Sequence, residues 1–365
     1  MSLSRLSIIR LHRVALGGLI LIFGMTSCGG PDGAEPVRER ARVSVVREGP
    51  DAVRVDGVAP LAGFAKGRDC TFIGCLEVLL ESAGRRISYD DLMAVSGMSF
   101  RTQFRVDRWD VGNPDPLVGD TRLDALFESV GWKYEVRIVR LDELAEKDAL
   151  HRAICRSIDA GMPVLAANII PPEDWGIITG YRRDRTYLCR SYNDGALTID
   201  EPAKGWPTAV VILTEKLSPP VRERMRMAAV KSAIELWEKR AVGPFAQGAH
   251  AFDQWSQLLR TVADRDYVHA NFWTYICLID ARASAVRYLR SVARDFGTKQ
   301  LHVAAAADFY DQEVRLLLDN LSSVPPEHEF KDSLPPAKVR NKQAEVLQSA
   351  KQIEAKAIES LKKAL

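Results

Sequence analysis

Apolar residues recur at three- and four-residue intervals along much of this chain, and in its middle they alternate with polar ones or form short runs. The first pattern is typical of amphipathic helices and the second of strands. Before residue 218 the helical spacing predicts helices over residues 71–82, 89–95, 121–130 and 148–160. The strand-like pieces lie at residues 132–139, 164–170, 175–181, 186–192 and 208–213.

After residue 220 the pattern is almost wholly helical. Five helices are predicted there, over residues 228–240, 249–262, 271–293, 301–318 and 337–365. Ser218-Pro219-Pro220 separates the two patterns, so we predict two domains of different class. The first, residues 43–218, is an α+β domain, and the second, residues 221–365, is a helical bundle. The last helix either packs on this bundle or serves a partner helix.

The amino terminus has the pattern of an export signal. Arginines at positions 5, 10 and 13 precede an uncharged apolar run over residues 14–25, shorter than the roughly 20 residues that a membrane-spanning helix needs. We therefore predict a signal peptide over residues 1–27. Met25-Thr26-Ser27-Cys28 resembles the bacterial lipoprotein cleavage box, which implies lipid on Cys28, a flexible tether over residues 28–42 and a membrane-anchored protein in the periplasm or on the cell surface. The alternative is an ordinary signal peptide, with Cys28 incidental.

Charge and cysteine content narrow the classes of partner. The chain has 50 basic and 48 acidic residues, and this balance gives no electrostatic footprint for nucleic acid. Proteins, small molecules or cell-wall material are the expected partners. A lipidated Cys28 would leave five of the six cysteines, an odd number, so at least one thiol should be unpaired. A Cys70–Cys75 disulfide is not expected on one helix, and pairing of Cys155 with Cys189 stays open.

Four sequence words resemble a known superfamily. The segment CTFIGCLEVLLESAG, which begins at Cys70, is similar to the cysteine-helix-glycine segment of the bacteriocin-processing peptidase group and of the amino-terminal domain of the butirosin-biosynthesis acyltransferase group. SYDDLMAVSGMSF, GMPVLAANI and WGIITGY also resemble the second group. The resemblance covers residues 57–215 and implies a papain-like domain, in which helices are followed by an antiparallel sheet.

That resemblance implies chemistry that this sequence only partly supports. A cysteine at a helix N-terminus has its thiolate favoured, and Cys70 fits, but it needs a histidine base and an orienting Asn or Asp. In the peptidase relatives the histidine opens the strand that ends in Gly-Tyr, and here Asp174 stands there. A carboxylate at that position should raise the thiol pKa. The usual upstream glutamine is missing, and Asn193-Asp194 lies just after the orienting position, where it could equally be a turn.

The other candidates have structural alternatives. His151 is the only histidine in the first domain and is either a base or an exposed or capping helix residue; His269 could reach across a domain interface. Arg101 and Trp109 could line a groove for an acidic or aromatic ligand, or could belong to a solvated loop. Trp175 is a core or cleft-edge residue. No histidine pair has metal-ligand spacing, so neither a metal nor a cofactor is predicted.

Two function classes remain open on the sequence alone. One is a catalytically impaired papain-like scaffold that is held on a membrane by its lipid and binds a peptide or small molecule in its cleft. The other is a Cys70-dependent hydrolase or acyltransferase acting on an amide, ester or thioester, with a base from outside the expected strand. Whether an imidazole lies within hydrogen-bond range of the Cys70 sulfur separates the two.

Overall fold

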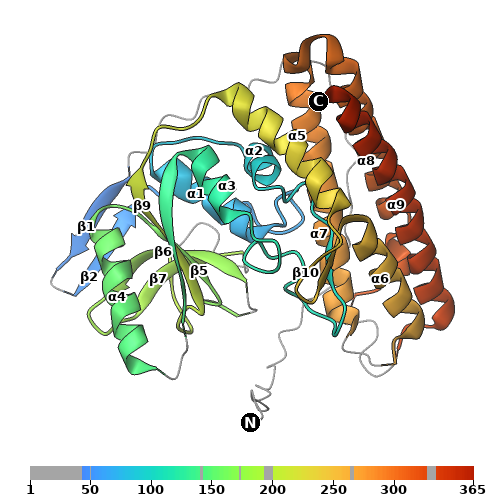
Figure 1. Cartoon of the computed structure of the whole chain (residues 1–365). Helices are drawn as coiled ribbons and strands as arrows, with labels where there is room; N and C mark the ends of the chain where they lie inside the picture. Colours follow the sequence, from blue (N-terminus) through green and yellow to red (C-terminus); the bar gives the residue numbers. More distant parts are fainter. Residues whose placement is uncertain are drawn as a thin grey trace. The chain divides into compact units, whose positions relative to one another are not determined.

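The structure is a computed structural model that describes residues 43–49, 51–139, 143–171, 174–192, 200–263, 267–326 and 334–365. Residues Arg40–Leu365 form one compact unit. Its class is mixed α+β, with an antiparallel sheet and a helical carboxyl-terminal region, which confirms the predicted class at that level. In Figure 1 the sheet lies at the left and helices α5 to α9 lie at the right.

The described residues form two sheets, and every strand pair given for them is antiparallel. The larger has the order β1-β2-β6-β5-β9-β4, with β7 pairing to β6 and β8 to β7; the smaller has the order β10-β11-β3. Their strands are β1 (Ser44–Glu48), β2 (Ala52–Asp56), β3 (Gln103–Arg105), β4 (Trp132–Ile138), β5 (Val164–Ala167), β6 (Trp175–Arg182), β7 (Tyr187–Ser191), β8 (Glu201–Pro202), β9 (Ala209–Lys216), β10 (Ala241–Val242) and β11 (Phe245–Gln247).

Helices pack against the larger sheet and build the carboxyl-terminal region. Helices α1 and α4 contact β5 and β6 of the sheet, while α5 to α9 pack mostly on one another. The helices are α1 (Thr71–Ser82), α2 (Tyr89–Val95), α3 (Leu123–Val130), α4 (Leu144–Asp159), α5 (Arg222–Glu238), α6 (Gly248–Thr261), α7 (Tyr267–Val292), α8 (Gln300–Asp319) and α9 (Ala337–Ala364), with short 3-10 helices η1 (Ala293–Lys299) and η2 (Leu321–Ser323).

Local signals explain most of these bounds. The α2 helix begins after Ser88, whose hydroxyl accepts from the Asp91 N–H at 3.1 Å, and α3 ends at Gly131, which adopts a left-handed φ of 68°. The strand β5 ends at Ala167, before the predicted residue 170. The reason is Asn168, whose φ of 63° turns the chain out of the sheet.

One segment joins the sheet region to the helical region. The main core lies between the sheet and α1 to α4, and two further cores lie among α5 to α9. Ala94 and Phe100 belong to one of the helical cores and Phe104 to the other. Strand β3, which contains Phe104, pairs with β11. Residues 94–105 therefore pack into the cores of the helical region before the chain returns to α3 and the larger sheet, and several of them line the same cavity as Cys70.

Candidate functional site

Cys70 stands at the start of α1, where the sequence analysis places a nucleophile. It is the N-cap residue of α1, and its carbonyl accepts the first helical hydrogen bond from the Gly74 N–H at 3.0 Å. Its own N–H donates to the Tyr89 hydroxyl at 3.0 Å. The unpaired amides and the dipole at this end of a helix favour a thiolate over a thiol. Position in the fold therefore suits a reactive cysteine.

The groups around Cys70 disfavour the thiolate form of its side chain. Burial is the largest effect and raises the pKa of the thiol well above its ordinary value, and the carboxylates of Asp280 and Asp115 raise it further. The Ile73 amide and the Arg101 guanidinium lower the pKa but do not offset the burial. The thiol is therefore protonated at neutral pH, and a protonated thiol is a poor nucleophile.

Asp174 lies beside the start of α1, next to the first residue of β6. The Thr71 hydroxyl and the Trp175 N–H both donate to its Oδ1, the second at 2.8 Å. Burial raises the pKa of Asp174 to about 6, and those two hydrogen bonds oppose the shift. Its carboxylate is thus tied to the residue that follows Cys70. This is the side chain that stands where the resemblance implies a histidine.

A second carboxylate approaches from the helical region, on α7. Asp280 Oδ2 accepts from the Tyr89 hydroxyl at 2.6 Å and from the Asp69 N–H at 3.2 Å, while its Oδ1 is buried without a partner. Burial and the neighbouring Asp69 charge raise the pKa of Asp280 to about 6. Sequence reasoning missed Asp280. The available signal was a lone acidic residue in the apolar run YICLIDARA.

The space beside the Cys70 thiol is nearly filled. A cavity of about 30 Å³ lies there, and since a water needs roughly 10–15 Å³ by this measure, it has room for about two water molecules. One wall comes from residues 93–114 and another from α7. The polar and small residues of these walls include Arg101, Gln103, Asn113, Thr274, Cys277 and Ala281. Cys277 of α7 is buried and faces this cavity.

Helix α7 is fixed in this place by a buried arginine. The Arg282 side chain is fully buried and donates to Glu354 of α9 at 2.8 Å and to the Ser99 carbonyl at 3.0 Å. It also donates to the Thr102 hydroxyl and lies 3.4 Å from a carboxylate oxygen of Glu313. Breaking a buried ion pair by removing one partner typically costs about 3–5 kcal/mol. Arg282 therefore locks α7 to the segment that forms the other cavity wall.

The described histidines all lie away from Cys70. His151, on α4, contacts the Tyr187 hydroxyl at 3.1 Å and the Cys155 sulfur at 3.5 Å. His269 and His302 are exposed, and His250 is half-buried on α6. Within the ranges that the structure describes, no imidazole is hydrogen-bonded to Cys70. His151 is half-buried, and burial lowers the pKa of its imidazole.

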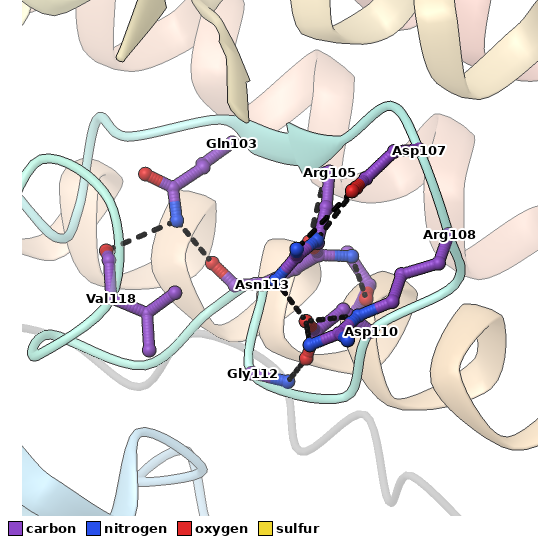
Figure 2. Close-up of polar contacts among 9 residues, drawn as sticks. Gln103, Arg105, Asp107, Arg108, Asp110, Gly112, Asn113 and Val118 are labelled. Carbon is purple, nitrogen blue, oxygen red and sulfur yellow. Dashed lines mark hydrogen bonds and ion pairs between the residues drawn. The ribbon is translucent and has the colours of Figure 1, made fainter. Parts of the chain in front are cut away.

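Arg101 is engaged by the backbone of a neighbouring loop. Its guanidinium donates to the carbonyls of Asp115 at 2.8 Å, Asp120 at 2.9 Å and Val118 at 3.1 Å. Gln103 holds the same loop, as Figure 2 shows, by donating to the Asn113 and Val118 carbonyls, each at 3.1 Å. These contacts satisfy backbone groups that burial would otherwise leave unpaired. They favour the structural alternative for Arg101 over a ligand groove.

The outer part of this loop is a partly exposed ion-pair network. Arg105 donates to Asp107 at 2.6 Å and to Asp110 at 3.2 Å, and Arg108 also reaches Asp110 at 3.2 Å (Figure 2). These arginines are therefore neutralised by carboxylates of their own loop. Exposed pairs of this kind typically contribute about 0–1 kcal/mol each, so the network shapes the loop without anchoring the fold.

The two tryptophans singled out on the sequence are packed by aromatic rings. Trp109 lies 5.2 Å from the Phe104 ring and 5.1 Å from the Tyr267 ring. Trp175 lies edge-on to Phe72 at 4.9 Å, and its Nε1–H donates to Asp115 Oδ2 at 2.7 Å. Such contacts are typical of anchoring aromatics with a satisfied polar atom. Trp175 is a core residue at the end of α1 that carries Cys70.

Comparison with known proteins does not identify a family for this site. No protein-family model and no curated protein matches the chain. The papain-like resemblance consequently rests on the sequence words quoted above and on the order of the elements.

Some predicted residues lie outside the described ranges. They are Cys28, Asn193 and Asp194. Among the helices that the structure describes, none is long and apolar enough to cross a bilayer. The five cysteines in the described ranges are all free, so Cys155 and Cys189 do not pair with each other. Over the same residues, no group of three or more His, Cys, Asp or Glu side chains is placed to hold a metal ion.

Proposed function

We propose that this protein is an exported, lipid-anchored scaffold whose papain-like domain has lost cysteine catalysis. The support for the fold is the order of its parts: a cysteine at a helix N-terminus, further helices, and then an antiparallel sheet whose strand β6 begins beside that cysteine. Export and the lipid on Cys28 are proposed from the amino-terminal sequence pattern.

The observation that carries the loss of catalysis is the identity of the group at the base position. Asp174 stands there as a half-buried carboxylate and is already hydrogen-bonded by Thr71 and Trp175. The imidazole of an active enzyme accepts the thiol proton and then stabilises the thiolate, whereas a nearby charged carboxylate disfavours the thiolate. The carboxylates that raise the pKa of the Cys70 thiol are those of Asp280 and Asp115.

The small volume of the cavity beside Cys70 bears on where a ligand would bind. A space of about 30 Å³ does not admit a peptide side chain or a small organic molecule. We therefore propose that a peptide or small-molecule partner reaches the cleft only if α7 or residues 98–114 move aside. With these elements in place, Cys277, Ala281 and residues of the 98–114 segment occupy the space beside Cys70 where a substrate would bind.

A Cys70-dependent hydrolase or acyltransferase is the second candidate. One observation favours it: burial raises the pKa values of Asp174 and Asp280 to about 6, close to the range in which a carboxylate can act as a general base near neutral pH. In this form one of the two carboxylates would accept the thiol proton. The described contacts include no hydrogen bond from the Cys70 sulfur to either carboxylate, so the scaffold remains the better supported function.

Covalent probe labelling tests the proposed function. The mature chain is treated with a thiol-directed activity-based probe such as an acyloxymethyl ketone, and labelled sites are read by peptide mass spectrometry. We expect no labelling of Cys70 beyond the level seen with Cys75, a fully buried cysteine on the same helix. Labelling of Cys70 that is rapid at neutral pH and disappears in Cys70→Ala would instead establish the enzyme. Denatured protein, in which both thiols react, is the positive control.

A further inference from the structure

A buried carboxyl group lies at the contact between α7 and the start of α1. Asp280 of α7 is only 4 % exposed. Its Oδ2 accepts from the Asp69 N–H, in the segment before α1, and from the Tyr89 hydroxyl of α2. The same hydroxyl accepts from the Cys70 N–H. The Asp280 carboxyl group therefore joins α7 to the two elements that hold Cys70 in place.

Over the ranges that the structure describes, no cation forms an ion pair with this carboxyl group. Arg287, two turns later on α7, directs its guanidinium to Asp90 of α2 through two hydrogen bonds of 2.8 Å. Asp280 Oδ1 is buried without a hydrogen-bond partner, and the Asp69 charge acts on the same group. Burying a carboxylate that lacks a cation is costly, whereas a protonated carboxyl group is neutral. The packed position of α7 therefore favours a proton on Asp280.

The other groups around Asp280 do not reverse this preference. Burial and the Asp69 charge raise the pKa of Asp280 to about 6, and the Tyr89 hydroxyl and the Arg287 charge oppose them only in part. An aspartate exposed to water titrates near pH 3.9. The packed position of α7 is therefore stabilised in full below about pH 4, and this stabilisation is lost as the pH rises to about 6. The titratable and charged groups that face Asp280 are Asp69 and Cys70 from the start of α1, Tyr89 from α2, and Cys277 and Arg287 from α7 itself.

We propose that Asp280 makes the closure of α7 over Cys70 sensitive to pH, so that α7 stays packed while Asp280 holds a proton and opens more often once that proton is lost. The proton passes from the carboxyl group to solvent, and the carboxylate is hydrated when α7 moves away. This inference rests on the proposed function, in which a partner reaches the cleft only after such a movement. A peptide or small molecule is then admitted near neutral pH and excluded in acid.

Labelling of Cys277 tests the proposal, because this buried thiol of α7 faces the cavity and is not the candidate nucleophile. The cavity of about 30 Å³ is too small for N-ethylmaleimide, so labelling requires an opening. Wild type and Asp280→Asn are labelled at pH values from about 4.5 to 7.5, and the rates are read by peptide mass spectrometry. Dividing the wild-type rate by the variant rate cancels the ionisation of the exposed thiol. We expect this ratio to rise by roughly tenfold or more over the series, since Asn has no proton to lose in this range.

Two further variants separate Asp280 from other carboxylates and from a simple loss of folding. Asp253→Asn removes a partly exposed carboxylate that pairs with Lys351 between α6 and α9, and its Cys277 labelling should follow the wild type at every pH. Tyr89→Phe keeps the Asp280 carboxylate but removes a hydrogen bond that favours its charged form. In this variant the rise in labelling should therefore move to higher pH. Circular dichroism checks the fold of each variant.

Cys75 provides the reference for global unfolding, because it is fully buried in the core and does not line the cavity. A ratio that stays constant with pH would overturn the proposal. A Cys277 rate equal to the Cys75 rate throughout would also overturn it, because α7 would then open only when the whole chain unfolds. Rapid labelling of Cys70 by the acyloxymethyl ketone would instead contradict the loss of catalysis, and it would leave the Cys277 ratio unchanged.

Discussion

Cys70 and Cys155 differ both in their place on a helix and in the side chains that lie next to the sulfur. Cys70 has the position of a nucleophile, at the N-terminus of α1, but is surrounded by Asp115, Asp280 and a nearly filled cavity. Cys155 lies in the fourth turn of α4, away from the helix N-terminus that would favour a thiolate, yet it touches an imidazole at 3.5 Å. Burial raises the pKa of the Cys155 thiol to about 11, and it raises the pKa of the Cys70 thiol further.

Under the proposed function, the difference indicates which features of a cysteine site survive a loss of catalysis. Helix N-termini follow from the fold, so a cysteine keeps its backbone amides whatever residue stands at the base position. The base is a single side chain and can change independently. Under the same proposal, Asp174 stands at the base position of Cys70, and Asp280 of α7 raises the pKa of the thiol. At Cys155 the imidazole is present, although nothing in the fold class predicts it.

The largest effect is expected from removing the Asp280 carboxylate, which makes the surroundings of Cys70 more acidic than those of Cys155. Because burial raises the pKa of Asp280 to about 6, the folded state holds its proton more tightly than the unfolded state does. The resulting stabilisation is complete below about pH 4 and is lost as the pH rises to about 6, a change of up to about 3 kcal/mol. In Asp280→Asn we expect that part of the fall in the free energy of unfolding to vanish, as measured by urea denaturation at a series of pH values.

An exposed carboxylate provides the control for this variant. Hydrogen bonding to Arg105 lowers the pKa of Asp107, so Asp107→Asn should change the pH dependence in the opposite direction, and only slightly, since the pair is exposed. If the pH dependence of the free energy of unfolding is the same in Asp280→Asn as in the wild type, the pKa of Asp280 is not raised in the folded state.

A smaller loss of stability is expected from adding a methyl group to α1, the helix that follows Cys70. A Cβ added at Gly74 would lie 1.8 Å from the hydroxyl of Tyr192, which is buried and cannot move aside. Overpacking of a core typically costs about 1–3 kcal/mol, which outweighs the gain of up to about 1 kcal/mol in helix propensity. We expect Gly74→Ala to lower the urea midpoint. Gly205→Ala is the matched control, since its nearest contact would be 3.7 Å away, and its midpoint should stay near wild type.

Much of the fold follows from local sequence signals. The bounds of α1 and α2 agree with the predicted residues 71–82 and 89–95, because apolar spacing, Ser88 and Gly84 define them locally. The hairpin of β1 and β2 was missed. Most of its residues are exposed or half-buried, so the alternation that marks a strand is weak. The early start of α7, at Tyr267 and not at residue 271, was missed as well.

The candidate site was predictable only where it depends on neighbours in sequence. Cys70 and Asp174 were identified by counting along motifs, and the Thr71 hydrogen bond places Asp174 beside α1. Asp280 comes from a helix more than 200 residues later, and its approach depends on how α7 packs, which periodicity does not specify. The His151–Cys155 pair could have been found, since both residues fall on one face of the helix predicted over residues 148–160.

The alkylation rate of Cys70 as a function of pH tests the central claim most directly. Iodoacetamide modification is followed peptide by peptide in Cys155→Ser, so that the more accessible thiol does not consume the reagent, and Cys70→Ala identifies the signal. If burial and the carboxylates hold the thiol protonated, the rate at Cys70 should be low at pH 7 and should still rise tenfold per pH unit up to about pH 10. A rate that is rapid at pH 7 and reaches a plateau below about pH 8 would contradict the account, because it would show a stabilised thiolate at Cys70.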